Sequence, residues 1–336
     1  MLKLENLQPS GSFKSRGVGN YLLQHHAAAQ QTNASSGNSV LSNGTSATKI
    51  HFFISSGGNA GLACVHAART LSCPATVVVP LSTKPMMVTK LREAGAHEVI
   101  QYGATWKDAD IHLRETAMPE AENGGVKAVY VPPFDHEMVW DGNSTLVNEV
   151  SEDLEKLEGA RIAPAAVVCS VGGGGLFNGI YRGIERQDGW NDTKLVALET
   201  HGADSLNQSL AKGEHTTLPG ITSLATSLGA TRVSSKTYEL ATAGQKFGRV
   251  KSAVFSDAEA AMGSVELADK QNLLVEIACG INVAVCFGGR LEKIVGRKIG
   301  KEEIVVVVVC GGSAINVEMV REWRDKYVGA LENGAE

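Results

Sequence analysis

The sequence has no excess of positive charge. Its 336 residues include 31 lysines and arginines against 36 aspartates and glutamates, which gives a formal net charge of −5. Domains that bind nucleic acids usually carry a basic patch or stripe, so we expect no nucleic-acid partner. No apolar run reaches the roughly 18 residues that a membrane-spanning helix needs. The longest, IVVVVVC at 304–310, predicts a buried strand, and we expect no membrane association.

Targeting signals and metal motifs are also lacking. Met1 is followed by LKLENLQ, which has neither the basic region nor the apolar core of a secretory signal peptide. None of the six cysteines forms a C-x-x-C pair, and a chain of this length does not need disulfides. The nine histidines show no metal-ligand spacing. We therefore predict reduced cysteines, no structural zinc and a cytoplasmic location.

Short runs rich in valine and isoleucine alternate with stretches typical of helices. Strand-like runs occupy 50–54, 75–79, 96–102, 128–131, 165–171, 194–199 and 303–310. Helix-like stretches occupy 60–71, 84–94, 144–157, 176–187, 257–269 and 314–328. Apolar strands that alternate with helices predict an α/β fold whose parallel sheets are covered on both sides. Several of the strands run into clusters of glycine and serine, and ligands of such folds bind at the carboxyl ends of the strands.

A lysine near the start of the chain lies among small polar residues. The stretch LENLQPSGSFKSRG at 4–17 surrounds Lys14 with serine and glycine. Taken alone, it leaves open an ordinary surface lysine and a reactive amine. Small neighbours would allow another molecule to approach the amine closely. Desolvation and nearby positive charge would lower the pKa of Lys14, which suits imine formation and proton abstraction.

Two glycine-rich stretches each follow a predicted strand and open a predicted helix. SVGGGGLFNG at 170–179 is suited to a phosphate, because backbone N–H groups at a helix N-terminus converge on an anion. A tight strand-to-helix turn is the alternative. The stretch 170–179 matches neither the G-x-G-x-x-G pattern nor a Walker motif, so we expect it to bind the phosphate of a group other than NAD or ATP. In SSGGNAGLA at 55–63, Ser56, Gly57 and backbone amides would hold a carboxylate, although an N-cap asparagine at Asn59 explains the stretch equally well.

Together, a lysine in a small-residue loop, a phosphate cradle and a carboxylate loop predict pyridoxal phosphate (PLP) as the cofactor. Seven stretches spread over nearly the whole chain carry a more specific resemblance: LENLQPSGSFKSRG, SSGGNAGLA, SVGGGGLFNG, LVALETHGADSL, LPGITSLATSLGA, LLVEIACGINVA and VVCGGSAIN. In this order they resemble the L-serine/L-threonine dehydratases of the fold-type II (tryptophan synthase β-like) PLP enzymes. The cysteine of VCGGS is similar to that of the animal and fungal serine dehydratases. The resemblance implies two doubly wound α/β domains with mainly parallel sheets and the cofactor in the interdomain cleft.

The resemblance also implies roles for individual residues. Lys14 matches the Schiff-base lysine, Phe13 the aromatic against the cofactor ring, and Cys310 the residue that faces the pyridine nitrogen. Asn59 matches the partner of the ring hydroxyl. The phosphate-binding loop corresponds to Gly172, Gly173, Gly174, Gly175 and Leu176. The loop that grips the substrate carboxylate corresponds to Ser56, Gly57, Asn59 and Ala60. A monovalent-cation site, with K⁺ as the candidate ion, corresponds to Glu199, Ala203 and Ser205.

Domain boundaries and a reaction follow from the same resemblance. We predict a large PLP-binding domain from 1–44 and 131–336 and a small domain at 45–130. The polar, low-complexity stretch 30–48 predicts a flexible loop. The implied reaction deaminates L-serine to pyruvate and ammonia, and L-threonine to 2-oxobutanoate and ammonia. We expect a homodimer.

Three alternatives stay open at this point. Serine racemase and β-replacement synthases share the fold, although racemase-like relatives tend to have serine where Cys310 stands. Relatives usually carry a further segment, including T-P-L, before the LKLE strand, so an inactive, N-terminally truncated pseudoenzyme is the third alternative. A second departure is Asn143, where the related pattern has a histidine. Nothing after Glu336 resembles a regulatory domain, and we expect no allosteric control by isoleucine.

Overall fold

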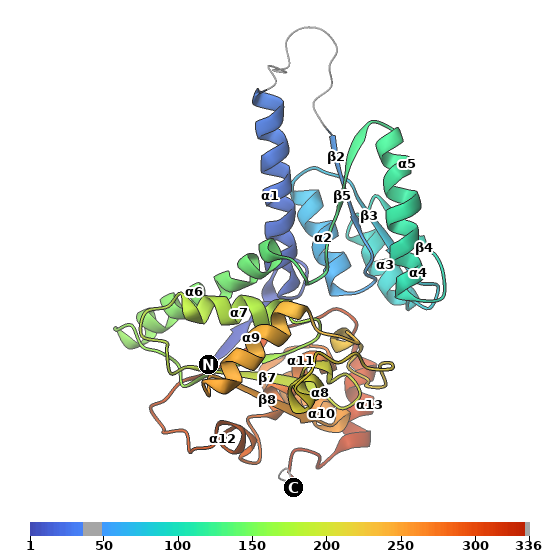
Figure 1. The fold of residues 1–336 in the computed structure, drawn as a ribbon. Helices are drawn as coiled ribbons and strands as arrows, with labels where there is room; N and C mark the ends of the chain where they lie inside the picture. Colours follow the sequence, from blue (N-terminus) through green and yellow to red (C-terminus); the bar gives the residue numbers. More distant parts are fainter. Residues whose placement is uncertain (36–48, 333–336) are drawn as a thin grey trace. The chain divides into compact units, whose positions relative to one another are not determined.

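The computed structural model describes residues 1–35 and 49–332. The chain divides into two compact units, each built around one sheet (Figure 1). The larger unit consists of Met1–Phe13 and Asn143–Glu336, and the smaller unit is Lys14–Gly142.

A five-stranded parallel sheet forms the centre of the larger unit. Its strands lie in the order β1 (Leu2–Leu4), β9 (Val305–Val309), β6 (Ala166–Ser170), β7 (Lys194–Thr200) and β8 (Val250–Phe255). The central strands are almost entirely buried and rich in valine, as expected for a parallel sheet covered on both faces. Because β6 lies between β9 and β7, the loops that follow these three strands meet at one edge of the sheet.

Helices pack around this sheet. They are α6 (Glu137–Glu158), α7 (Gly175–Glu185), α8 (Ser205–Lys212), α9 (Ser235–Lys246), α10 (Asp257–Gln271), α11 (Ile277–Ala284), α12 (Arg290–Val295) and α13 (Val317–Tyr327), with short 3₁₀ turns η1 (Glu5–Leu7) and η3 (Thr226–Leu228). Helix α11 is buried along its whole length and packs on β6, β7 and β9. Helix α7 contacts β6 and β7, while α8 and α9 contact β8. Their apolar side chains form one continuous core with the sheet.

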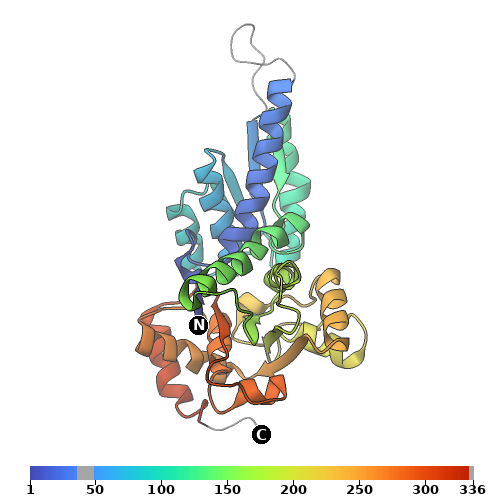
Figure 2. The same cartoon turned by 90° about the vertical axis from the view of Figure 1, so that its left-hand side faces the viewer.

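The smaller unit holds a four-stranded parallel sheet. Its strands lie in the order β4 (Glu98–Gln101), β3 (Ala75–Val79), β2 (Lys49–Ile54) and β5 (Val126–Tyr130). The helices are α1 (Lys14–Ser35), α2 (Asn59–Thr70), α3 (Pro85–Glu93), α4 (Trp106–His112), the π-helix η2 (Leu113–Ala117) and α5 (Met118–Asn123). The long α1 lies beside α2, as Figures 1 and 2 show. A capping box between Thr105 and Asp108 fixes the start of α4.

The predicted α/β class with parallel sheets is confirmed, since the strand pairs of both sheets in the described parts are parallel. One expectation was wrong in part: residues 30–35 belong to the last turns of α1 rather than to a loop. The run of alanine and glutamine at 27–31 favours a helix and carries α1 into this stretch despite its polar composition. The rest of the predicted loop, 36–48, lies outside the described residues. The predicted domain boundaries and the placement of a cofactor between two domains stay predictions. Within the described ranges, no helix combines the length and hydrophobicity that crossing a bilayer requires.

Candidate active site

The four-glycine turn follows β6 and opens α7. Gly174 is the N-cap of α7 and has a φ of +95°, in the left-handed region that favours glycine. A Cβ atom at Gly174 would lie 1.9 Å from Oγ1 of Thr237, and one at Gly172 would lie 3.2 Å from Cα of Leu228. The N–H groups of Gly175 and Leu176, in the first turn of the helix, have no intrahelical acceptor. The turn is therefore a cradle that side chains would fill, with free helix amides suited to an anion.

Asn143, a residue to which the sequence assigned no role, forms a hydrogen bond to the backbone of the cradle. Asn143 lies on α6 and is buried, and its side-chain amide donates to the carbonyl of Gly175 at 2.9 Å. Its own carbonyl oxygen, Oδ1, has no hydrogen-bond partner in the described parts of the chain. The residue that departs from the related pattern thus contacts the predicted phosphate loop directly.

Cys310 follows β9 and is tied to the segment that leads into Lys14. The N–H of Phe13 donates to the carbonyl of Cys310 at 3.1 Å, and the N–H of Gly312 donates to that of Gly11 at 2.9 Å. An antiparallel bridge pairs Ser12 with Gly311. The structure therefore brings Phe13 and Cys310 together, as their predicted roles on one cofactor ring require.

Lys14 is the next residue after Phe13 and the first residue of α1. Its Nζ donates to the carbonyl of Pro133 at 2.5 Å and lies 6.0 Å from the ring centroid of Phe134. The side chain is half-buried, in contrast to the freely solvated lysine of the alternative interpretation. The 133–134 segment was not singled out by the sequence, because nothing in its composition separates it from an ordinary loop.

The predicted carboxylate loop joins β2 to α2. The N-cap of α2 is Gly58, so the alternative that Asn59 serves as N-cap is wrong: Asn59 is the first helical residue. A Cβ atom at Gly57 would lie 2.7 Å from Thr83 and one at Gly61 would lie 2.0 Å from the carbonyl of Ser56. These close approaches fix the loop at the start of α2, where Ser56 and Gly57 precede the helix and Asn59 and Ala60 are its first two residues.

Trp106 supports this loop and was missed from the sequence. Its indole Nε1 donates to the carbonyl of Ser55 at 2.7 Å, although about half of the residue is exposed. It is the first residue of α4, whose start the capping box holds in place. A single tryptophan after a threonine has no periodic signal, so only the fold reveals this contact.

Glu199, Ala203 and Ser205, the predicted cation residues, lie around the turn from β7 to α8. All three are buried, and the Glu199 carboxylate accepts from the N–H groups of Leu206 and Asn207 at 2.9 and 2.7 Å. Burial raises the pKa of Glu199 to about 8 despite these two hydrogen bonds. Oγ of Ser205 has no hydrogen-bond partner among the described residues. Within the same ranges, no group of three or more His, Cys, Asp or Glu residues is placed to hold a metal ion.

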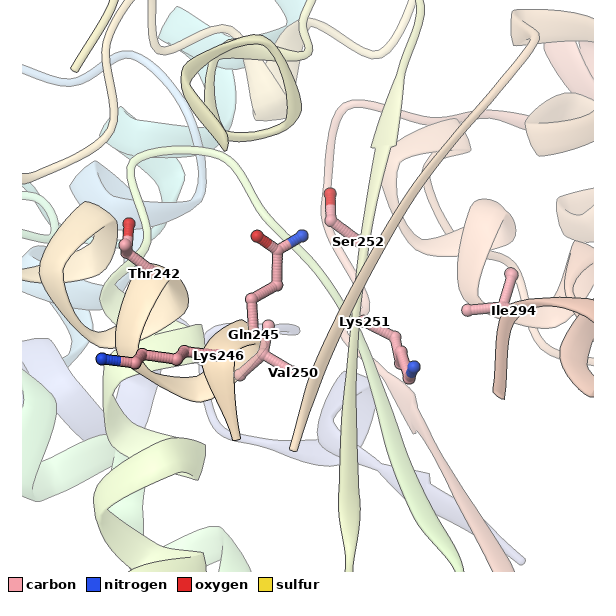
Figure 3. A pocket seen from close by; sticks show the side chains of 7 residues that line it. All are labelled: Thr242, Gln245, Lys246, Val250, Lys251, Ser252 and Ile294. Atoms are coloured by element: carbon pink, nitrogen blue, oxygen red, sulfur yellow. The ribbon is translucent and has the colours of Figure 1, made fainter. Parts of the chain in front are cut away.

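A separate open pocket lies beside the edge strand β8 and contains none of the predicted site residues. It is lined by Thr242, Gln245, Lys246, Val250, Lys251, Ser252 and Ile294. Figure 3 shows the Lys246 and Lys251 side chains pointing apart, so they do not form a joint anion site.

Comparisons with known proteins show the family to which the chain belongs. The family model described as "Pyridoxal-phosphate dependent enzyme" matches residues 1–311. An L-serine dehydratase of Saccharomyces cerevisiae is 42% identical over 318 residues, which cover 94% of this chain and 89% of the relative. The catabolic L-serine/threonine dehydratase of the same yeast is 37% identical over 96% of this chain and 85% of the relative. The crystal structure of a fungal L-serine ammonia-lyase from Rhizomucor miehei superposes with a TM-score of 0.79 at 34% identity, covering 97% of this chain and 92% of that one. The chain therefore belongs to the pyridoxal-phosphate dependent enzymes, in the fold-type II group.

Proposed function

We propose that this protein is an L-serine ammonia-lyase that also accepts L-threonine. The observation that carries the proposal is the four-glycine cradle at the start of α7, in a chain 42% identical to an L-serine dehydratase over 94% of its length. The reaction removes the proton at Cα and the hydroxyl at Cβ, and the resulting enamine hydrolyses. L-serine thus yields pyruvate and ammonia, and L-threonine yields 2-oxobutanoate and ammonia.

We assign a contact with PLP to each of the following residues. The amides of Gly172, Gly173, Gly174, Gly175 and Leu176 would hold the phosphate. Phe13 would lie against the ring, Cys310 would face the ring nitrogen, and Asn59 would donate to the ring hydroxyl. When bound, PLP supplies an electron sink for negative charge at the substrate Cα.

Lys14 would bind the cofactor covalently and then move the Cα proton as its general base. Support comes from its position directly after Phe13, whose backbone is tied to Cys310, and from its half-buried amine. The carbonyl of Pro133, 2.5 Å from Nζ, orients this amine.

The substrate carboxylate would be held by Ser56, Gly57, Asn59 and Ala60 at the start of α2. The positive end of the helix favours a carboxylate there. Thr83 packs against the loop and Trp106 hydrogen-bonds to it, so its conformation is fixed before the substrate binds. The loop would therefore orient the amino acid without a further loss of conformational entropy.

Glu199, Ala203 and Ser205 would bind a monovalent cation, K⁺ being the candidate. The buried carboxylate and the unpartnered Ser205 hydroxyl are oxygen ligands of the kind that a hard cation takes. A homodimer in the cytoplasm completes the proposal, and the family resemblance supports both assignments.

An absorption spectrum tests the proposed function. Purified protein is mixed with PLP and scanned before and after the addition of L-serine, and the products are analysed. A visible band that Lys14→Ala lacks, with pyruvate formed on addition of serine, is the expected result. D-serine as the main product would instead indicate a racemase, and cysteine formed in the presence of sulfide a β-replacement synthase. Absence of the band in both proteins would indicate an inactive relative.

A further inference from the structure

The backbone of the four-glycine turn receives a hydrogen bond from the start of α9. The N–H of Ser234, the N-cap of that helix, donates to the carbonyl of Gly173 at 3.0 Å. A trans peptide is planar, and its N–H points opposite to its C=O. The contact with Ser234 therefore directs the N–H of Gly174 away from α9. That N–H is one of those assigned to the phosphate.

Ser234 belongs to a ring of three side chains between α7 and α9. The amide of Asn178 donates through Nδ2 to Oγ of Ser234 at 3.3 Å, and Oγ1 of Thr237 donates to Oδ1 of Asn178 at 3.0 Å. The two hydroxyl oxygens lie 2.8 Å apart. Because the single hydroxyl hydrogen of Thr237 is directed to Asn178, the hydrogen between the two hydroxyls comes from Ser234. Each side chain thus donates once and accepts once, and the ring is closed.

The ring lies in the core of the larger unit. Asn178 and Thr237 are fully buried, and Ser234 is 4% exposed. Buried polar groups cost free energy unless they are hydrogen-bonded, so packing alone would favour apolar side chains at these positions. A fully satisfied polar network, in contrast, makes the elements that it joins rigid relative to each other. The ring therefore fixes the start of α9 against α7.

All three members of the ring also contact the glycine cradle. Besides the bond from Ser234 to Gly173, the backbone N–H of Asn178 donates to the carbonyl of Gly174 at 2.8 Å. The side chain of Thr237 packs against Gly174 so closely that a Cβ atom there would collide with its hydroxyl. The network and the two central glycines of the turn are thus held as one piece.

We propose that Asn178, Ser234 and Thr237 are positioning residues that hold the peptides of Gly173 and Gly174 in the conformation that binds a phosphate. The inference rests on the proposed assignment of the PLP phosphate to this cradle. It goes further because these three side chains act through the backbone of the turn. Loss of the ring should therefore weaken binding of the phosphate group and leave binding of the rest of the cofactor unchanged.

Paired titrations with PLP and with pyridoxal, which lacks the phosphate, separate this role from a general structural one. The full chain without cofactor is titrated with each compound and followed by absorbance. Thr237→Val removes one hydroxyl of the ring with little change in shape. It should weaken PLP binding about tenfold and leave the pyridoxal affinity within about twofold. Thr237→Ser retains the hydroxyl and should restore the PLP affinity. Thr242→Val, at an exposed threonine of the same helix, is the matched control.

Ser234→Gly carries the test if Thr237→Val fails to fold. Glycine is accepted at an N-cap and retains the N–H that bonds to Gly173, so this variant removes the ring and spares the backbone contact. It should weaken PLP binding in the same selective way. Equal losses of PLP and pyridoxal affinity, or no loss of either, would overturn the proposal.

Inorganic phosphate, titrated by calorimetry, separates failure of the proposal from failure of the proposed function. If no protein binds PLP but Thr237→Val binds phosphate about tenfold more weakly than the parent, the proposed function fails and the positioning role stands. If the parent forms pyruvate from L-serine with PLP and the ring variants bind PLP as the parent does, the function stands and the positioning role fails. A parent that binds neither PLP nor phosphate would overturn both.

Discussion

The side-chain amide of Asn143 donates to the carbonyl of Gly175 at 2.9 Å and thereby joins α6 to the glycine cradle at the start of α7. The contact fixes the peptide between Gly175 and Leu176, whose N–H is one of those assigned to the phosphate. An asparagine where the related pattern has a histidine thus keeps a donor at this point of the fold.

We expect Asn143→Ala to weaken PLP binding about fivefold, because one buried hydrogen bond of about 1 kcal/mol is lost behind the phosphate loop. Titration of the full chain with PLP, followed by absorbance, measures the change. Asn148→Ala is the matched control, since Asn148 lies on the same helix but is exposed, and its side chain accepts a hydrogen bond from Gln187 instead of contacting the cradle. Equal affinities for the two variants would show that Asn143 does not support the loop.

Gly174→Ala is expected to destabilise the larger unit and to reduce PLP affinity at least tenfold. The substitution adds strain at φ +95° to a collision with Thr237, for a combined cost of about 2–5 kcal/mol. Gly189→Ala separates the backbone strain from the collision, because Gly189 also has a positive φ, +83°, but a Cβ atom added there would have no atom within 4 Å. Urea unfolding should show a loss of only about 1 kcal/mol for Gly189→Ala. Similar losses for both variants would mean that the cradle tolerates a side chain.

The parts of the fold that could be predicted are those whose signal is local. The valine-rich β9 and the runs at β6 and β7 are buried on both faces, and they are the strands that the sequence predicts most clearly. Strand β8 was missed because Lys251 and Ser252 interrupt its apolar run at the edge of the sheet. Helix α11 was missed because its glycine and β-branched residues do not favour a helix, and tertiary packing decides its structure.

The candidate site shows the same division. The glycine cradle and the carboxylate loop are visible as composition, whereas Asn143 and Trp106 act on backbone carbonyls that lie 32 and 51 residues away in the chain. A contact between one polar side chain and a distant carbonyl leaves no pattern in the sequence. Only the arrangement of strands and helices makes these two residues recognisable.

Trp106→Phe should raise the KM for L-serine about fivefold and leave kcat within about twofold, because it removes one hydrogen bond, worth about 1 kcal/mol, from the carboxylate loop. Steady-state kinetics of pyruvate formation measures both constants. Leu81→Ala, an exposed position in the smaller unit, is the control and should leave both unchanged. A fall in kcat without a change in KM would argue that Trp106 acts on a step other than substrate binding.

The stability of the protein should depend on pH and on K⁺ through Glu199. Its pKa is raised from 4.5 to about 8, so the folded chain holds the carboxyl proton over a range in which the unfolded chain has lost it. The contribution of Glu199 to stability is therefore fully present below about pH 4.5 and is lost as pH rises toward 8. A cation bound to the ionised carboxylate would offset this loss.

We accordingly expect K⁺ to raise the melting temperature by about 3 °C at pH 8.5, relative to tetramethylammonium at equal ionic strength, and by much less at pH 6. At pH 6 the proton competes with K⁺ for the Glu199 carboxylate. The difference between the K⁺ effects on the melting temperature at pH 8.5 and pH 6 therefore reports on the ionisation of one carboxyl group. Glu199→Gln should abolish it, whereas Glu185→Gln, at a partly exposed carboxylate, should retain it. An equal effect of K⁺ at both pH values, or one that persists in Glu199→Gln, would place the cation elsewhere.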